Sequence, residues 1–178
     1  TTEHFPYEEI RTKFKNTRKD ITITEENIED FLGLEYEDAN VWYVLSLLQG
    51  VHNPAVQYHK DHLYPKNIFI RPQEGSDKLL RFEETMQSAF PNPEDRAFAE
   101  DRKNWNTLPN LQLLEGSQNE SKGDTPLAEW AKRTGKSAVS FYVPANTNLD
   151  LANFKPFIEA RRDAIRLKLL AILKPEAS

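Results

Sequence analysis

Residues 108–122 read LPNLQLLEGSQNESK, and the character of this stretch changes halfway along it. Residues 110–114, NLQLL, form a short run rich in leucine, which predicts a buried strand. From Ser117 onward the residues are polar, and we expect a helix there that stops near Gly123. The stretch therefore predicts a strand that leads into a helix.

An earlier segment supplies a partner for this strand. Residues 56–60, VQYHK, are predicted as a short strand, and the sequence DHLYP follows at residues 61–65. A long mixed stretch, 65–109, is rich in Pro, Asn, Asp and charged residues. The central region thus has the order strand, long connection, strand and helix, which predicts an α+β fold.

Helical segments are expected on both sides of this region. Capping residues or proline at the start, and glycine at the end, mark most of their limits. The expected helices cover residues 6–16, 25–33, 38–50, 93–104, 125–135 and 153–174, whereas residues 139–150 are expected to be irregular. We therefore predict a small strand–strand–helix core embedded in a mostly helical domain.

The composition excludes several classes of protein. The 178 residues include no cysteine, which rules out disulfides and thiolate zinc sites, and 19 aromatic residues are enough for a packed core. No apolar run approaches the ~20 residues that a membrane-spanning helix needs, so no membrane partner is expected. The chain begins at Thr1 without a signal peptide, from which we expect a cytoplasmic location and a piece cut from a longer protein.

The formal net charge is −5, and it is unevenly distributed. Residues 1–50 carry 11 acidic and 5 basic side chains, whereas residues 51–178 carry 17 acidic and 18 basic ones. The region that contains the motifs is thus close to neutral. A nucleic-acid enzyme needs only a local basic strip, so the charge neither supports nor excludes a DNA partner.

Two motifs taken together resemble the HNH signature of endonucleases. The first is DHLYP at residues 61–65, and the second is NLQLL at residues 110–114 followed by Asn-x-x-Lys at residues 119–122. Each is weak alone, but their order and spacing make the combination specific. The segment NLQLLEGSQNESKGDTPLAEW is most similar to the HNH domain at the C-terminus of GmrSD-type restriction proteins, and the resemblance covers roughly residues 40–135.

This resemblance implies a ββα-metal nuclease core. It would occupy residues 51–136 with the long insertion 65–109, and the N-terminal helical segment 1–50 and the C-terminal extension 137–178 would belong to the same domain. The implied activity is cleavage of DNA with Mg²⁺ or Mn²⁺, in restriction or antiviral defence. The parent protein would carry a further N-terminal domain that hydrolyses or senses nucleotides. His62 and Asn110 are 48 residues apart, which exceeds the spacing of compact members and leaves the role of the insertion open.

The resemblance also implies a role for each site residue. His62 is expected to be the general base, because a neutral imidazole accepts a proton from water near neutral pH. Asp61 and Asn119 supply the oxygen ligands that a hard cation prefers. Asn110 is expected to brace the backbone behind His62, since catalysis is sensitive to small misplacements. Lys122 is a candidate phosphate contact.

Three alternative functions stay open from the sequence. The first is a module with a nuclease-like fold that binds DNA without cutting it, although the intact Asp61, His62 and Asn119 argue against it. The second is a helical protein-interaction domain in which the motifs are a coincidence. The third is a nuclease specific for RNA or for a nucleic-acid structure.

Other residues also have a second interpretation. His52, His59 and His62 suggest zinc, but strand residues three positions apart point to opposite faces. The three tryptophans are interpreted as core or edge packing rather than as platforms for bases. The basic residues of segment 153–174 are interpreted as a solvated face, with a phosphate-tracking surface as the alternative.

Overall fold

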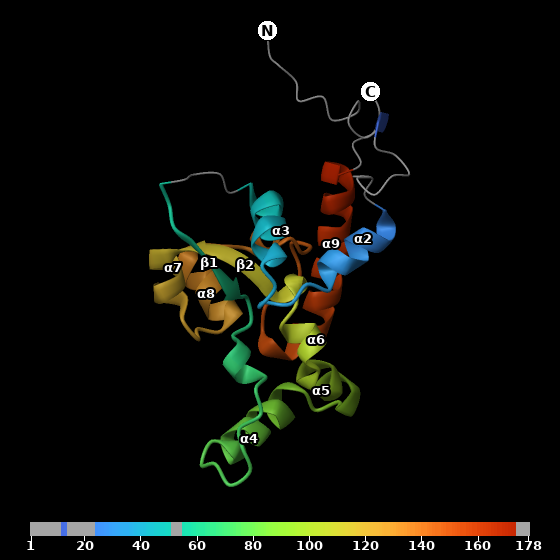
Figure 1. The fold of residues 1–178 in the computed structure, drawn as a ribbon. Coiled ribbons are helices and arrows are strands. Elements are labelled where there is room, and N and C mark those ends of the chain that lie inside the picture. Colours follow the sequence, from blue (N-terminus) through green and yellow to red (C-terminus); the bar gives the residue numbers. More distant parts are fainter. Residues whose placement is uncertain (1–11, 14–23, 51–54, 174–178) are drawn as a thin grey trace.

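The computed structural model describes residues 12–13, 24–50 and 55–173. Figure 1 shows many helices arranged around one small sheet. The helices are α2 (Glu25–Leu32), α3 (Asn40–Gln49), α4 (Leu79–Ala89), α5 (Pro93–Glu100), α6 (Arg102–Trp105), α7 (Gly116–Lys122), α8 (Leu127–Thr134) and α9 (Phe154–Leu173). Four short 3-10 turns are η1 (Lys66–Ile68), η2 (Leu108–Asn110), η3 (Ala138–Phe141) and η4 (Leu151–Asn153). The helix expected at residues 6–16 lies almost entirely outside the described residues.

The sheet consists of two antiparallel strands, β1 (Tyr58–His62) and β2 (Leu111–Glu115). Tyr58 is opposite Glu115 and His62 is opposite Leu111. α7 begins at the residue after β2 and contacts both strands. The predicted α+β class is confirmed, but β1 begins later than the expected segment 56–60, because β2 provides partners only as far as Tyr58.

The predicted helix limits are confirmed where capping residues mark them. The side-chain oxygen of Thr24 accepts a hydrogen bond from the backbone N–H of Asn27 at 3.2 Å, which caps the start of α2. Gly50 ends α3 and Gly135 ends α8, each in the left-handed conformation with φ of 65° and 66°. A side chain with a Cβ is strained in this conformation, so glycine stops both helices.

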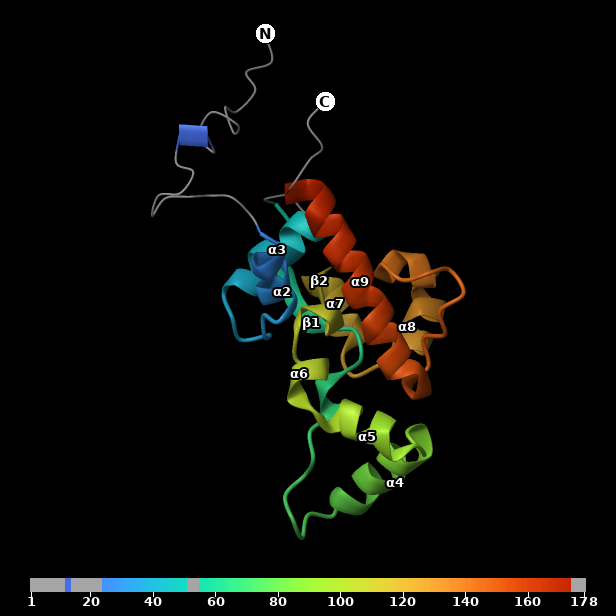
Figure 2. The ribbon, with the colours of Figure 1, turned by 90° about the vertical axis from the view of Figure 1, so that its right-hand side faces the viewer.

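The long connection 65–109 contains more helix than its composition predicts. α4 is not among the predicted helices, and Figures 1 and 2 place it at one end of the molecule, away from the sheet. The helix predicted at 93–104 is wrong in one respect, because it is divided into α5 and α6. At the break, Asp101 has an extended backbone, and its side chain accepts a hydrogen bond from Lys103 N at 2.9 Å, which starts α6.

Two hydrophobic clusters lie on the two sides of the sheet. Leu113 and Leu114 of β2 belong to different clusters, as alternation along a strand requires. The long helix α9 (Figure 2) contributes to both clusters, with Phe154 in one and Leu169 in the other. β2 is therefore buried on both faces, whereas all residues of β1 except His62 are partly exposed.

Two further findings concern the chain as a whole. Trp105 and Trp130 belong to the core, as interpreted from the sequence, whereas Trp42 is 39% exposed and lies edge-on against Tyr43. None of the helices in the described ranges has both the length and the apolar composition needed to cross a membrane.

Candidate active site

The two motif residues at the end of β1 lie on opposite faces of the sheet. Asp61 is opposite Gln112 in the register, and Gln112 Nε2 donates a 2.9 Å hydrogen bond to Asp61 Oδ2. Directly opposed residues share a face, so Asp61 and Gln112 are on one side. His62, the next residue, is on the other side. The pair that the sequence places together is thus divided between two environments.

Lys122 joins α7 to the end of β1. Its ammonium lies 3.1 Å from Asp61 Oδ2 and donates a 2.7 Å hydrogen bond to the carbonyl oxygen of His62. The side chain of Lys122 has no exposed area. Lys122 therefore has a place inside the fold, different from the predicted contact with a phosphate, because α7 packs against β1 and turns this residue inward.

The Asp61 carboxylate is largely withdrawn from water, with 13% of its side chain exposed. Burial raises the pKa of Asp61, and this effect outweighs the opposing effects of the Lys122 ammonium and the Gln112 amide. A carboxylate desolvated in this way gains from any further positive charge close to it. Asp61 is therefore one of the residues that could hold a divalent cation.

Asn119 lies one turn before Lys122 on α7. Residues three apart share a helix face, so Asn119 is on the same face of α7 as Lys122, which contacts Asp61. It is half-buried, and within the described part of the chain its side-chain amide makes no hydrogen bond. Its carbonyl oxygen is thus available as a second ligand for a hard cation.

These two oxygens are few for a metal site. The described residues contain no group of three or more His, Asp or Glu side chains able to hold a metal ion. Two such oxygens would leave most ligand positions of a Mg²⁺ or Mn²⁺ ion to water, which these ions give up reluctantly. Of the three histidines considered for zinc, His52 is outside the described residues, and His59 is on the face of β1 opposite to His62.

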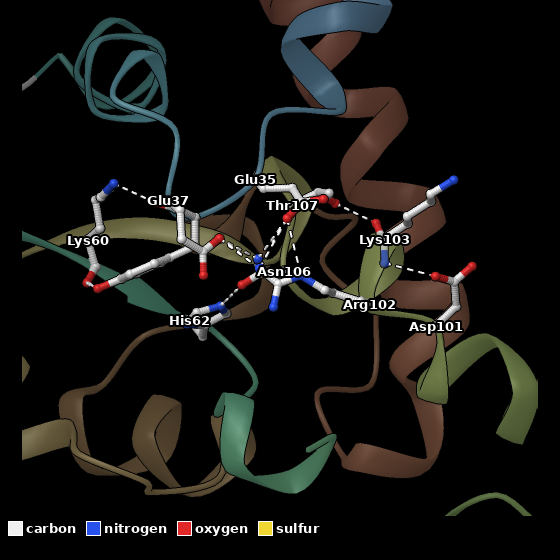
Figure 3. A network of polar contacts seen from close by, with 10 residues as sticks. Glu35, Glu37, Lys60, His62, Asp101, Arg102, Lys103, Asn106 and Thr107 are labelled. Carbon is white, nitrogen blue, oxygen red and sulfur yellow. Dashed lines mark hydrogen bonds and ion pairs between the residues drawn. The ribbon is translucent and has the colours of Figure 1, made fainter. Parts of the chain in front are cut away.

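The imidazole of His62 is buried and 6% exposed. The Tyr36 ring stacks on it with a centroid distance of 4.8 Å and an interplanar angle of 18°, and Trp105 lies 6.3 Å away. His62 Nε2 is 3.0 Å from Asn106 Oδ1, and Figure 3 shows the two side chains turned toward each other. Burial lowers the pKa of His62 to about 4 against the opposing effect of the Asn106 hydrogen bond, so the ring is neutral near pH 7.

The segment that carries Tyr36 runs along the residues before β2. Tyr36 N donates to Asn106 O at 2.9 Å, Leu108 N donates to Leu34 O at 3.0 Å, and Glu35 forms an isolated β-bridge with Thr107. Tyr36 is also attached to β1, because its backbone oxygen accepts a hydrogen bond from the Lys60 ammonium. This segment, residues 34–37, is called the cover segment below because it overlies His62.

Asn106 also joins His62 to a network of charged side chains (Figure 3). Asn106 Nδ2 donates a 2.8 Å hydrogen bond to Glu37 Oε2. The Arg102 guanidinium lies 2.9 Å from Glu37 and 3.1 Å from Glu35. The sequence analysis missed this network, and the only local signal for it is an asparagine four positions before Asn110.

Asn110 makes the backbone contacts that the sequence predicts. Its side-chain oxygen accepts a 3.0 Å hydrogen bond from Tyr64 N, and its Nδ2 donates to the carbonyl oxygens of Tyr64 at 3.1 Å and Trp105 at 2.8 Å. The side chain is fully buried. A single amide thus joins the chain after His62 to the chain before β2, which fixes the position of both.

Arg161 of α9 also bonds the backbone on either side of Asn110. Its guanidinium is buried and donates to the carbonyl oxygens of Pro109 at 3.3 Å and Leu111 at 2.9 Å. Burial lowers the pKa of Arg161 to about 9. Arg162 and Arg166 both pair with Glu29 of α2. Arg161 is thus buried, in contrast to the solvated face inferred for this helix, whereas Arg162 and Arg166 stay partly exposed in their ion pairs with Glu29.

Comparison with known proteins does not assign the chain to a family. No protein-family model matches the chain, and no curated protein matches it.

Proposed function

We propose that this domain is a divalent-metal-dependent endonuclease that hydrolyses phosphodiester bonds in DNA. The observation that carries the proposal is the strand–strand–helix unit in which β1 ends at Asp61 and His62, and α7 carries Asn119 one turn before Lys122, the ionic partner of Asp61. A carboxylate, an amide oxygen and, on the face of β1 opposite to the carboxylate, a neutral imidazole are thereby held on two elements that Lys122 ties together.

Each residue has a defined part in the proposed reaction. Asp61 and Asn119 are the ligands of Mg²⁺ or Mn²⁺, which supplies Lewis acidity toward the scissile phosphate when bound. His62 accepts a proton from the attacking water, whose oxygen bonds to phosphorus as the bond to the leaving oxygen breaks. Asn110 holds the chain that follows His62, so that the imidazole keeps its orientation.

The cover segment limits access to His62. Because Tyr36 stacks on the ring and only 6% of His62 is exposed, DNA reaches the imidazole only when this segment moves aside. The proposed reaction therefore includes an opening step at Tyr36 before proton transfer. Lid movements of this kind precede chemistry in many enzymes.

A second function, binding of DNA without cleavage, is favoured by two observations. Lys122 already neutralises the Asp61 carboxylate, and Tyr36 covers His62. A site held permanently in this state would bind a nucleic acid through other surfaces and would not react. Metal-dependent cleavage separates this candidate from the first.

The decisive experiment incubates the purified chain with supercoiled plasmid in Mg²⁺, Mn²⁺ or EDTA. We expect metal-dependent nicking or linearisation that EDTA abolishes and that is lost in His62→Ala. His59→Ala is the matched control, because it removes an imidazole from the same strand on the opposite face. Parallel reactions with RNA of the same sequence test the choice of nucleic acid.

Two outcomes of this assay count against the nuclease. Equal cutting by wild type and His62→Ala would remove His62 as the base. No cutting, together with a DNA mobility shift and no response to metal, would support the binding module. We further propose that the parent protein is cytoplasmic, acts in defence against foreign DNA and carries a nucleotide-responsive N-terminal domain, so the assay is repeated with the full-length parent protein.

A further inference from the structure

Asn106 occupies a buried position between His62 and a pair of glutamates. Its side chain is 1% exposed, and it contacts His62 through Oδ1 at 3.0 Å and Glu37 through Nδ2 at 2.8 Å (Figure 3). Asn110 has the role of brace for the backbone, so Asn106 is not needed for that purpose. Its side-chain contacts instead concern the imidazole directly.

The Glu37 carboxylate determines which way the Asn106 amide points. An ionised carboxylate only accepts hydrogen bonds, so the donor end of the amide must face Glu37 and the acceptor end must face His62. The hydrogen bond from Asn106 is the largest influence on Glu37 and lowers its pKa, which keeps the carboxylate ionised at neutral pH. Glu35 Oε2, 3.4 Å from the same Nδ2, favours the same orientation.

This orientation sets the protonation pattern of the imidazole. Asn106 Oδ1 has no hydrogen to give, so the 3.0 Å contact requires that His62 Nε2 carries the hydrogen. In a neutral ring the other nitrogen, Nδ1, then keeps its lone pair. Carboxylate–amide–imidazole chains of this type select one tautomer, as second-shell partners of metal-bound histidines do.

The surroundings hold Asn106 and the ring rigidly enough for this selection. The backbone of Asn106 is bonded on both sides, by Asn106 N to Arg102 O at 2.9 Å and by Tyr36 N to Asn106 O at 2.9 Å. Arg102 bridges Glu35 and Glu37. The stacked Tyr36 ring restricts the plane of the imidazole.

We infer that Asn106, oriented by Glu37, is a positioning residue that fixes His62 in the tautomer with hydrogen on Nε2 and leaves Nδ1 as the atom that accepts the proton of water. The statement about water rests on the proposed nuclease function, whereas the statement about the tautomer does not. Nδ1 is therefore the nitrogen that must become accessible when the cover segment moves.

The test measures the tautomer directly, by long-range ¹H–¹⁵N correlation NMR of the intact chain labelled at the histidine rings, at neutral pH in EDTA. His62→Gln assigns the signals of residue 62. We expect wild-type His62 to show a protonated Nε2 and an unprotonated Nδ1. Asn106→Ala should give a mixture of both tautomers, whereas Asn106→Asp, which keeps an acceptor beside Nε2, should retain the wild-type pattern.

Asn104→Ala is the matched control, because Asn104 is an amide on α6, two residues before Asn106, and its side chain bonds Phe98 O. A wild-type ring protonated on Nδ1, or an unchanged tautomer in Asn106→Ala, would overturn the inference. If Asn106→Ala does not fold, the wild-type spectrum together with Asn106→Asp still decides it.

Cleavage kinetics on the same variants separate this inference from the proposed function. We expect kcat of Asn106→Ala to fall about 10- to 100-fold with little change in KM, and Asn106→Asp to recover part of the loss. The expected tautomers in a chain that never cuts would uphold the positioning by Asn106 and refute the nuclease. Cleavage by a wild-type chain whose His62 shows both tautomers would support the nuclease and refute the positioning by Asn106.

Discussion

The two faces of β1 hold neighbouring residues by different means. On the Asp61 face, a buried ammonium and a cross-strand amide surround a carboxylate. On the His62 face, a stacked phenol ring and one amide surround a neutral imidazole, and the charged groups, Glu37 and Arg102, lie one step farther out. One face is organised around charge and the other around shape and hydrogen-bond direction.

This difference suggests a division of labour within the proposed site. The Asp61 face consists of β2 and α7, which follow each other in the chain, and it is suited to hold a cation. The His62 face is closed by the cover segment and by the residues around α6, which come from distant parts of the chain. Metal affinity and imidazole orientation should therefore respond to different substitutions.

The largest effect is expected on the Asp61 face. Lys122→Met removes the cation that neutralises Asp61 and the donor to His62 O, leaving a buried carboxylate without its ionic partner. The free energy of unfolding should fall by about 3–5 kcal/mol, as measured by urea denaturation. Lys132→Met, an exposed lysine on α8, is the control and should change stability by less than about 0.5 kcal/mol. Equal stability of Lys122→Met and wild type would contradict the charge-based organisation of this face.

The burial of His62 should make the free energy of unfolding depend on pH. The pKa of His62 is about 4 in the folded chain against 6.5 in the unfolded chain, so the unfolded state binds more protons between these values. The free energy of unfolding should therefore fall as the pH is lowered from 6.5 to 4, with about 3 kcal/mol attributable to His62.

Urea denaturation in EDTA across this range, for wild type and His62→Gln, measures the contribution. Wild type should lose more stability than the variant toward pH 4, and the two should run parallel above pH 7. Parallel curves over the whole range would show that the folded environment leaves the imidazole as easily protonated as in the unfolded chain.

A smaller effect, the stabilisation of the fold by a bound metal ion, should distinguish the Asp61 face from the His62 face. If Asp61 and Asn119 bind Mn²⁺, a free ion concentration about ten times Kd stabilises the fold by about 1.4 kcal/mol. Asn119→Ala should abolish this stabilisation, measured as a shift in Tm, while the exposed neighbour Gln118→Ala should keep it. Asn106→Ala should also keep it, because Asn106 belongs to the other face. Loss of the shift in Asn106→Ala would break the proposed division of labour.

The predictions from the sequence succeed where neighbours in the chain determine the structure. The strand and helix of residues 111–122, the start of α2 and the glycine ends of α3 and α8 follow from short patterns and capping residues. The contact of Asn110 with the backbone of Tyr64, 46 residues away, was instead implied by the HNH resemblance. The predictions fail where distant segments meet. The break at Asp101, the helix α4 and the burial of Lys122 all depend on packing that no short pattern contains.

The sequence by itself determined the order strand, strand and helix, and it placed Asp61 and His62 at the end of the first strand and Asn119 on the helix, because hydrophobic period and end signals are local properties. Asn110, expected in the second strand, lies instead in η2, directly before that strand. Only the tertiary structure decided the partners of each side chain. Lys122 became the partner of Asp61 because α7 packs against β1, and Asn106 became the partner of His62 because the cover segment pairs with the residues before β2. Burial and the direction of hydrogen bonds, which set the chemistry of both residues, arise from those long-range contacts.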